Sequence, residues 1–249
     1  MPTLSASSVL RSLRNSNLSP PSMSALSASA VLRSLRNSNL SPRLLSSPSQ
    51  GYVYQIHNLL SPSASAALYD FLAYRFDGWK TEIDAFGPQQ RATAYFGDEG
   101  TIFSYVGLTL QPRPWPSEMD EARKAANLVA KAHGAVAATA CLANHYGEQR
   151  NSIPWHSDEV RAHGDSKLVL SLSLGGTRRM CIRPKGVAGQ VMSLHMPAGS
   201  AVVLAGDAQE YWEHSLPLDS DNAPRRVSLT FRTIVPWLEQ GRPPPSGTP

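Results

Sequence analysis

Three residues with metal-binding side chains, His156, Asp158 and His214, constrain most strongly how this chain can fold. Two imidazoles and one carboxylate on one face of a metal leave its other positions open, which is typical of non-haem iron centres. His156 and Asp158 are close in the chain, whereas 55 residues separate Asp158 from His214. A metal site therefore forms only if a whole domain folds around it. The alternative is that both histidines are ordinary hydrogen-bonded core residues.

A second feature favours the metal site, because Arg226 and Arg232 lie at the two ends of the segment Arg-Val-Ser-Leu-Thr-Phe-Arg. Side chains alternate between the faces of a β-strand, so the arginines share one face with Ser228 and Thr230 while three apolar residues share the other. A guanidinium binds a carboxylate through two parallel hydrogen bonds, which suits a dicarboxylate such as 2-oxoglutarate. The alternative is a solvent-exposed strand face.

Other segments extend this pattern in order along the chain. They are Gly107-Leu-Thr-Leu, Asn144-His-Tyr146, Ile153-Pro-Trp-His156-Ser-Asp158-Glu159, Ser171-Leu-Ser-Leu-Gly175 and Tyr211-Trp-Glu-His214-Ser-Leu-Pro217. From about residue 91 to 236 the chain resembles the AlkB family of Fe(II)- and 2-oxoglutarate-dependent nucleic-acid demethylases, in particular its eukaryotic repair branch. The resemblance implies that Fe(II) is held by His156, Asp158 and His214, and that 2-oxoglutarate is held by Asn144, Tyr146, Arg226 and Arg232.

The resemblance also implies an activity, the oxidative demethylation of bases such as 1-methyladenine or 3-methylcytosine in single-stranded DNA or RNA. Dioxygen and 2-oxoglutarate are consumed, and succinate, carbon dioxide and formaldehyde are released. A methylated base inside a duplex is inaccessible, so the base must be unpaired or flipped out. Tyr105 is our first candidate for stacking on that base and Phe103 the second. Core packing is the alternative for both rings.

The chain departs from the resembled enzymes at two places. They usually carry an acidic residue two positions after the iron-binding aspartate, where this chain has Val160. Glu159 could replace it if the loop shifts, although adjacent side chains in extended chain face opposite ways. Relatives that act on duplex DNA insert a longer hairpin with an apolar wedge near residues 82–90, for which we find no room. That absence favours single-stranded substrates.

The hydrophobic pattern predicts a mainly β fold of the α+β type. Helices are expected at 61–76, capped by Ser61, and at 117–133, opened by Ser117 and ended by Gly134. Strands are expected at 168–174, 200–204 and 227–235. This order, with two helices followed by a run of strands, is typical of a fold in which helices pack on the outside of an antiparallel β-sandwich. The resemblance implies a double-stranded β-helix, or jelly roll, supported by these helices.

Composition divides the chain into three parts. Residues 50–238 are expected to form the oxygenase domain, and the Pro-rich residues 239–249 a disordered tail. Residues 1–49 are expected to be a disordered leader, in which residues 4–20 recur as 26–42 with a single difference. The leader holds five arginines and no acidic residue, so the remainder, with 18 basic and 19 acidic residues, is nearly neutral. Global charge is therefore no evidence for a nucleic-acid partner.

The leader resembles an organelle transit peptide, with low-complexity disorder or an error in start-site choice as alternatives. We accordingly expect an intracellular protein of the nucleus, or of a plastid or mitochondrion, and a monomer. Cys141 and Cys181 fit reduced buried thiols, and no stretch is apolar enough to cross a membrane. A local basic patch at residues 178–185 has two open interpretations, phosphate contact or a solvated hairpin.

Two other functions compete with demethylation. One is an Fe(II)- and 2-oxoglutarate-dependent oxygenase that acts on protein or lipid. The other is a catalytically inactive nucleic-acid-binding module, which the complete ligand set and both arginines disfavour.

Overall fold

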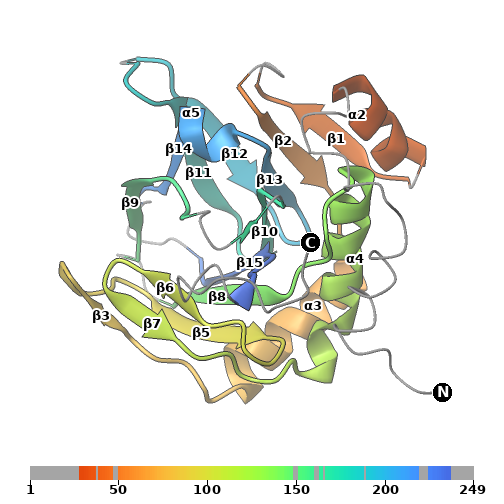
Figure 1. The fold of residues 1–249 in the computed structure, drawn as a ribbon. Helices are drawn as coiled ribbons and strands as arrows, with labels where there is room; N and C mark the ends of the chain where they lie inside the picture. Colours follow the sequence, from red (N-terminus) through yellow and green to blue (C-terminus); the bar gives the residue numbers. More distant parts are fainter. Residues whose placement is uncertain are drawn as a thin grey trace, which may run out of the picture.

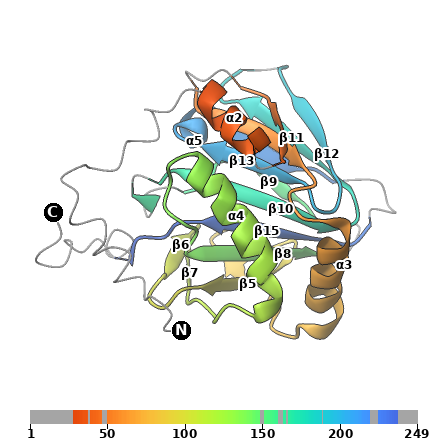
Figure 2. The same ribbon diagram turned by 90° about the vertical axis from the view of Figure 1, so that its right-hand side faces the viewer.

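The computed structural model describes residues 28–37, 39–46, 50–147, 151–159, 163–164, 166–187, 189–218 and 224–236. Two antiparallel sheets face each other, and helices cover the outer face of the larger one (Figures 1 and 2). The larger sheet has seven strands in the order β1-β2-β13-β10-β15-β8-β5, and the smaller has four in the order β12-β11-β14-β9. This arrangement confirms the mainly β, jelly-roll class that we expected.

The strands of the larger sheet are β1 (Ser41–Leu44), β2 (Tyr52–His57), β5 (Ala92–Gly97), β8 (Ala140–Tyr146), β10 (Leu168–Gly175), β13 (Ala201–Ala205) and β15 (Arg226–Arg232). Those of the smaller sheet are β9 (Ile153–His156), β11 (Arg178–Pro184), β12 (Met192–Met196) and β14 (Trp212–Leu216). Two short hairpins are formed by β3 (Ile83–Asp84) with β4 (Gly87–Pro88), and by β6 (Phe103–Tyr105) with β7 (Leu108–Leu110). The three expected strands are therefore present as β10, β13 and β15.

Both expected helices are present, with differences at their ends. Helix α3 (Pro62–Asp70) continues as a π-helical turn, η2 (Phe71–Arg75), and the Ala64 amide donates to Ser61 Oγ at 3.2 Å, so Ser61 is the N-cap. Helix α4 (Asp120–Ala132) follows a 3₁₀ turn, η3 (Ser117–Met119). Ser117 does not cap it, because its hydroxyl donates to the Glu118 carboxylate at 3.3 Å. None of the helices in the described part of the chain is long and apolar enough to span a membrane.

The structure differs from the expected disordered leader over part of its length. Residues 28–37 form helix α2 (Ala28–Asn37), and β1 pairs with β2 at the edge of the larger sheet. Val31 and Leu35 of α2 are 1% and 0% exposed and belong to the main core. Their helical spacing puts both on one face, and burying that face stabilises a segment that its Ser-rich composition would leave disordered. Residues 1–27 and the expected tail lie outside the described residues.

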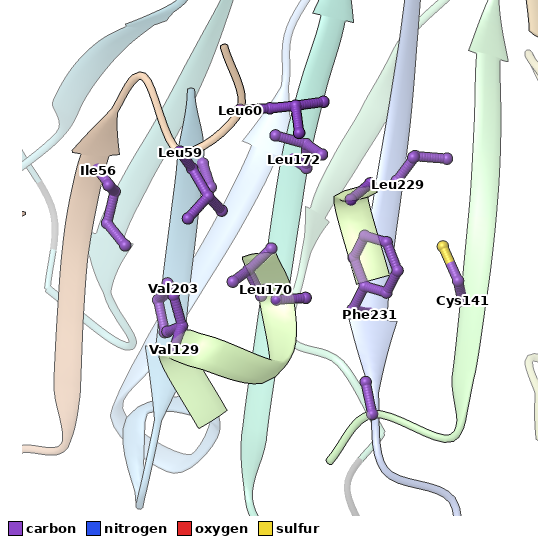
Figure 3. Packing of buried hydrophobic residues seen from close by; sticks show 14 of the residues in the cluster. Ile56, Leu59, Leu60, Val129, Cys141, Leu170, Leu172, Val203, Leu229 and Phe231 are labelled. Atoms are coloured by element: carbon purple, nitrogen blue, oxygen red, sulfur yellow. The ribbon is translucent and has the colours of Figure 1, made fainter. Parts of the chain in front are cut away.

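The main core fills the space between the larger sheet and the helices α2, α3 and α4. Figure 3 shows this cluster, in which Val129 of α4 packs with Leu170 and Val203 of the sheet. Leu229 and Phe231 of β15 belong to the same cluster and are fully buried. A second cluster joins the two sheets, and it includes Val202 of β13 and Ile182 of β11. The larger sheet therefore has a packed hydrophobic cluster on each of its faces.

The alternation in β15 places its polar residues on the inner side of the sandwich. Val227, like Leu229 and Phe231, faces the helices, whereas Arg226 and Arg232 line a cavity between the sheets. Both arginines are only 2% exposed, so the alternative of a solvent-exposed strand face is wrong. Strand β15 of the larger sheet thus places two buried guanidinium groups in the interior of the protein.

Candidate metal and cosubstrate site

A cavity of about 780 Å³ lies between the two sheets. All ten residues that the sequence analysis proposed for the site contribute to its lining: Phe103, Tyr105, Asn144, Tyr146, His156, Asp158, Glu159, His214, Arg226 and Arg232. They come from β6, β8, β9, β14 and β15 and from the segment after β9. The fold therefore gathers residues from four strands of the two large sheets and from the β6–β7 hairpin at one place.

The three candidate metal ligands are brought together by strand pairing. His156, the last residue of β9, is the Cα partner of His214 on β14, and Asp158 lies two residues beyond His156. One ligand atom from each of the three residues lies within 4.8 Å of the other two. The Asp158 Oδ2 atom is 4.0 Å from His214 Nε2. An ion with ligand distances of about 2 Å fits such a set.

The hydrogen bond of His156 leaves one ring nitrogen available for a metal. Its Nδ1 atom is 2.9 Å from the carbonyl oxygen of Pro154, which can accept a hydrogen bond from the Nδ1–H tautomer. This tautomer has a lone pair on Nε2, as a metal ligand needs. Burial is the main cause that lowers the pKa of His214 to about 4, so this imidazole is neutral at pH 7. His214 therefore presents a neutral imidazole to the cavity.

Asp158 is held in its ionised form. Burial alone would raise the pKa of this carboxyl group, but attraction to His214 in its protonated form and to the Arg232 guanidinium outweighs burial and lowers it. Arg232 Nη2 lies 3.6 Å from Asp158 Oδ1. The amide of Gln209 contacts both the backbone and the carboxylate of Asp158. Gln209 was missed by the sequence analysis, because nothing local in the chain links it to Asp158.

Arg232 has hydrogen-bonding capacity that the protein leaves unused. Within the described part of the chain, its Nε and Nη1 atoms are buried and have no hydrogen-bond partner. Unpaired buried donors are costly, which favours an acceptor that enters from the cavity. A carboxylate has the geometry to accept from a guanidinium fork. The residues at this end of β15 therefore fit one carboxylate of a dicarboxylate cosubstrate.

Arg226 forms a second cationic point at the other end of β15. Its Nε donates to Ser173 Oγ at 2.8 Å, its Nη2 donates to Ser228 Oγ at 3.3 Å, and its guanidinium lies 5.3 Å from the centre of the Tyr146 ring. Burial lowers the pKa of Arg226 from its ordinary value. Among the described residues, no carboxylate forms an ion pair with it. A buried cation without a counter-ion favours an anionic ligand.

Asn144 lies between the two arginines on the neighbouring strand β8, where it is the Cα partner of Ser228. Its Oδ1 atom accepts a hydrogen bond of 2.6 Å from Arg91 Nε. That bond fixes the orientation of the amide, with Oδ1 turned toward Arg91. Arg91 also lines the cavity and was missed by the sequence analysis, since only strand pairing brings it to Asn144.

The two candidate stacking residues differ in their surroundings. Phe103 is 3% exposed and packs against the rings of Tyr95 and Tyr105, at centroid distances of 5.9 and 5.3 Å. The guanidinium of Arg232 lies 4.5 Å from the Phe103 ring centre. Tyr105 is only partly buried, and its hydroxyl accepts a hydrogen bond from Gln89 at 3.2 Å. The core-packing alternative therefore describes Phe103, whereas Tyr105 keeps a surface toward the cavity.

The segment 82–90, where we expected no room for a longer hairpin with an apolar wedge, forms a short hairpin with an exposed aromatic residue. Strands β3 and β4 form a short hairpin, and Phe86 at its tip is 92% exposed. The Ala85 amide donates to the carbonyl oxygen of Val106 at 3.2 Å, which ties this tip to the β6–β7 hairpin. Phe86 and Val106 both border the cavity. The sequence analysis missed this hairpin because each of its strands has only two residues.

The other substrate-related expectations have mixed outcomes. Glu159 lines the cavity and is partly buried, while Val160 lies outside the described residues. In the expected basic patch, Arg178 is 1% exposed and Arg183 is paired with Glu213 at 2.6 Å. Those two cations are therefore engaged within the protein rather than presented as a free patch. Lys185 donates to the Gln209 carbonyl oxygen at 2.7 Å.

Comparison with known proteins gives an independent assignment. The sequence model of the 2OG-Fe(II) oxygenase superfamily matches residues 52–232. The chain is 30% identical over 177 residues to the DNA oxidative demethylase ALKBH2 of Bos taurus, covering 66% of this chain and 62% of that protein. It is 29% identical over 170 residues to the alpha-ketoglutarate-dependent dioxygenase alkB homolog 3 of Rattus norvegicus, covering 64% and 56%. The chain thus spans about six tenths of the length of these relatives.

The fold has counterparts among solved structures. The structure of OsALKBH1 superposes with a TM-score of 0.59 at 13% sequence identity, over 78% of this chain and 100% of that chain. At this identity the likeness concerns the fold alone. It agrees with the two facing antiparallel sheets described above.

Proposed function

Because this chain belongs to the 2OG-Fe(II) oxygenase superfamily, whose chemistry requires Fe(II) and 2-oxoglutarate, we propose that it oxidatively demethylates N-alkylated bases in DNA or RNA. The observation that carries this proposal is the juxtaposition of the candidate ligands with the unused donors of Arg232. The likeness to proteins named as DNA oxidative demethylases supports nucleic acid as the substrate class.

In this proposal His156, Asp158 and His214 hold the iron. The bound iron and 2-oxoglutarate supply the oxidising chemistry, by which a methyl group is hydroxylated with dioxygen while 2-oxoglutarate is converted to succinate and carbon dioxide. The protein contributes position and charge. Neutral imidazoles and an ionised Asp158 are the protonation states that metal ligands need, and the pKa shifts of His214 and Asp158 have the matching directions.

The two arginines would give 2-oxoglutarate a direction in the cavity. Arg232 lies 3.6 Å from the candidate metal ligand Asp158, so it would bind the carboxylate nearer the iron. Arg226, with Ser228 and Tyr146 beside it, binds the carboxylate at the far end. Asn144 lies between these points on β8 and contacts the chain of 2-oxoglutarate. Both guanidiniums are buried, and a charge-assisted hydrogen bond is stronger in such surroundings than in water.

The substrate base enters from the side of the two hairpins. Tyr105 lines the cavity and stacks on the base, since every base has a π-face that an aromatic ring can cover. Phe86, exposed next to the entrance, can fill the gap left when a base leaves a stack. We therefore include duplex DNA with single-stranded DNA or RNA among the substrates, with 1-methyladenine and 3-methylcytosine as the bases.

Release of formaldehyde and succinate tests this proposal directly. The full chain is incubated with Fe(II), 2-oxoglutarate and oligonucleotides that carry 1-methyladenine or 3-methylcytosine, in single-stranded and duplex form. We expect both products in equal amounts, and neither with Asp158→Ala. The control Asp70→Asn changes an exposed carboxylate of α3 that pairs with Arg75 and should keep full activity.

Three results would contradict the proposal in different ways. Succinate without formaldehyde would retain the oxygenase and move the search to a protein or lipid substrate. Oligonucleotide binding without either product would favour an inactive binding module. Equal activity in wild type and Asp158→Ala would remove the metal site from the proposal.

A further inference from the structure

Gln209 contacts Asp158 through both ends of its side-chain amide. The backbone N–H of Asp158 donates to Gln209 Oε1 at 2.9 Å, and Gln209 Nε2 donates to Asp158 Oδ2 at 3.3 Å. Gln209 is 4% exposed and lines the cavity. One side-chain amide is therefore hydrogen-bonded to both the backbone and the carboxylate of a residue that is 51 positions away in the chain.

The segment that carries Gln209 is itself anchored on several sides. Gln209 belongs to the short helix α5 (Ala208–Tyr211), whose Glu210 accepts from Lys167 Nζ at 3.0 Å. The carbonyl oxygen of Gln209 accepts from Lys185 Nζ at 2.7 Å. On the other side, Ser157 Oγ donates to the Trp212 carbonyl oxygen at 2.8 Å, which joins the Asp158 segment to β14. These contacts hold the amide in a fixed position.

We propose that Gln209 is a positioning residue that sets the orientation of the Asp158 carboxylate for metal binding, an inference that rests on the proposed function. A carboxylate on a loop rotates about its side-chain bonds, and each wrong rotamer lowers the affinity for the metal. The amide removes that freedom, because it has one acceptor for the Asp158 N–H and one donor for a carboxylate oxygen. Hydrogen bonds to ligating groups are known to tune metal sites in this way.

The position of Gln209 also couples two ligands. It lies five residues before His214, at the start of the segment that continues into β14. The same short stretch of chain therefore supplies one candidate ligand, His214, and holds another, Asp158. A displacement of α5 would move both together, so the geometry of the ligand set depends on this helix.

Titration of the metal-free protein with Co(II), followed by its visible absorption bands, tests the inference without turnover. We expect Gln209→Leu, which keeps the volume and loses both hydrogen bonds, to weaken Co(II) binding by roughly 10- to 100-fold and to change the band pattern. Gln209→Glu keeps an acceptor for the Asp158 N–H but faces Asp158 Oδ2 with a second negative charge. We expect it to bind Co(II) more weakly than the wild type as well, with a different spectrum.

Gln55→Leu is the matched control, because Gln55 is also buried, at 2% exposure, but donates to the carbonyl oxygen of His195 in the smaller sheet. Thermal unfolding of all variants without metal separates loss of fold from loss of metal affinity. We expect Gln55→Leu to lower the melting temperature and keep the Co(II) affinity and spectrum.

Wild-type Co(II) affinity and spectrum in both Gln209 variants would overturn the inference. Asp158→Ala distinguishes this failure from failure of the proposed function. If Asp158→Ala abolishes Co(II) binding while the Gln209 variants bind normally, only the role of Gln209 is wrong. If Asp158→Ala also binds normally, the metal site itself is wrong.

Discussion

His156 and His214 lie opposite each other on β9 and β14, with their ring centroids 4.2 Å apart. The register between these strands shifts beyond this pair, because Leu216 pairs with Ile153 and one extra residue is taken up in β9. Such a bulge re-aims side chains, and a slip of one residue would turn an imidazole to the opposite face of the sheet. Because His156 and His214 are direct partners, their imidazoles lie on the same face of the sheet, and both line the cavity.

Metal binding should stabilise the folded protein. A ligand present at 100 times its Kd adds about 2.7 kcal/mol of stability, which corresponds to a rise of roughly 5–10 °C in Tm for a domain of this size. We expect this rise on adding Co(II) to the metal-free protein, and its reversal by a chelator. His214→Ala should abolish the rise, whereas His57→Ala, at an exposed position at the end of β2, should preserve it. An equal rise in both variants would place the metal elsewhere.

Arg232→Lys should weaken the binding of 2-oxoglutarate by at least about tenfold, because a lysine replaces a two-point fork with a single charge. Calorimetric titration of the Mn(II)-loaded protein without substrate measures this affinity directly. Arg75→Lys, which changes an exposed ion pair with Asp70, is the control. Unchanged affinity in Arg232→Lys would mean that the buried unpaired donors of Arg232 do not bind the cosubstrate.

Substitution of Tyr105 should affect substrate binding, whereas substitution of Phe103 should affect the stability of the fold. Phe103→Ala removes a ring that is 3% exposed and should lower the free energy of unfolding by about 3–5 kcal/mol. Tyr105→Ala should weaken binding of a methylated single strand by about 1–3 kcal/mol, the value of one base–ring stack. Tyr105→Phe keeps the ring and should keep that affinity. Fluorescence-based binding and urea denaturation provide the two measurements, and full affinity in Tyr105→Ala would exclude stacking.

Phe86→Ala should distinguish duplex from single-stranded substrates. The side chain is 92% exposed at the hairpin tip, so its removal leaves the core intact. We expect a fall in demethylation of duplex DNA of about tenfold or more, since unstacking a base step costs a few kcal/mol, and little change on single strands. Tyr74→Ala, at another exposed aromatic position, is the control. Equal losses on both substrates would assign Phe86 a role other than duplex opening.

His133 should make stability depend on pH. It is 1% exposed, its ring stacks on Tyr54 with Nε2 bonded to the Tyr54 hydroxyl, and burial lowers its pKa from 6.5 to about 4. Between these values the unfolded chain binds more protons than the folded one. The contribution of His133 is thus complete above pH 6.5 and is lost as the pH falls toward 4, with a total of about 3 kcal/mol.

Urea denaturation at a series of pH values checks this sign. His133→Gln keeps a hydrogen-bonding side chain that does not titrate, so its free energy of unfolding should fall less steeply than that of the wild type between pH 6.5 and 4.5. Parallel curves would show that His133 makes no contribution to the pH dependence.

Much of the fold and the candidate site could be predicted from local patterns. The alternation in 226–232 predicted which side chains of β15 share a face, and helix α3 begins at the Ser61 cap. The short spacing of His156 and Asp158, with a later histidine, selected the residues that the structure brings within 4.8 Å. These features could be predicted because each depends on a short stretch of sequence: the alternation of side chains in a strand, the type of residue at a helix N-cap, and the types of residue that bind a metal.

Other features depend on contacts between residues far apart in the chain. The hydrogen bonds between Gln209 and Asp158, the bond from Arg91 to Asn144 and the burial of Phe103 arise from strand order and register. The packing of α2 on the core could not be predicted from its sequence either. Its Ser-rich composition favours disorder, and the helix is stabilised only because Val31 and Leu35 are buried in the core. The sequence by itself therefore determined which residues can bind a metal and a dicarboxylate. Only the tertiary structure decided which other side chains position those residues, since packing free energy is shared among residues that no local pattern connects.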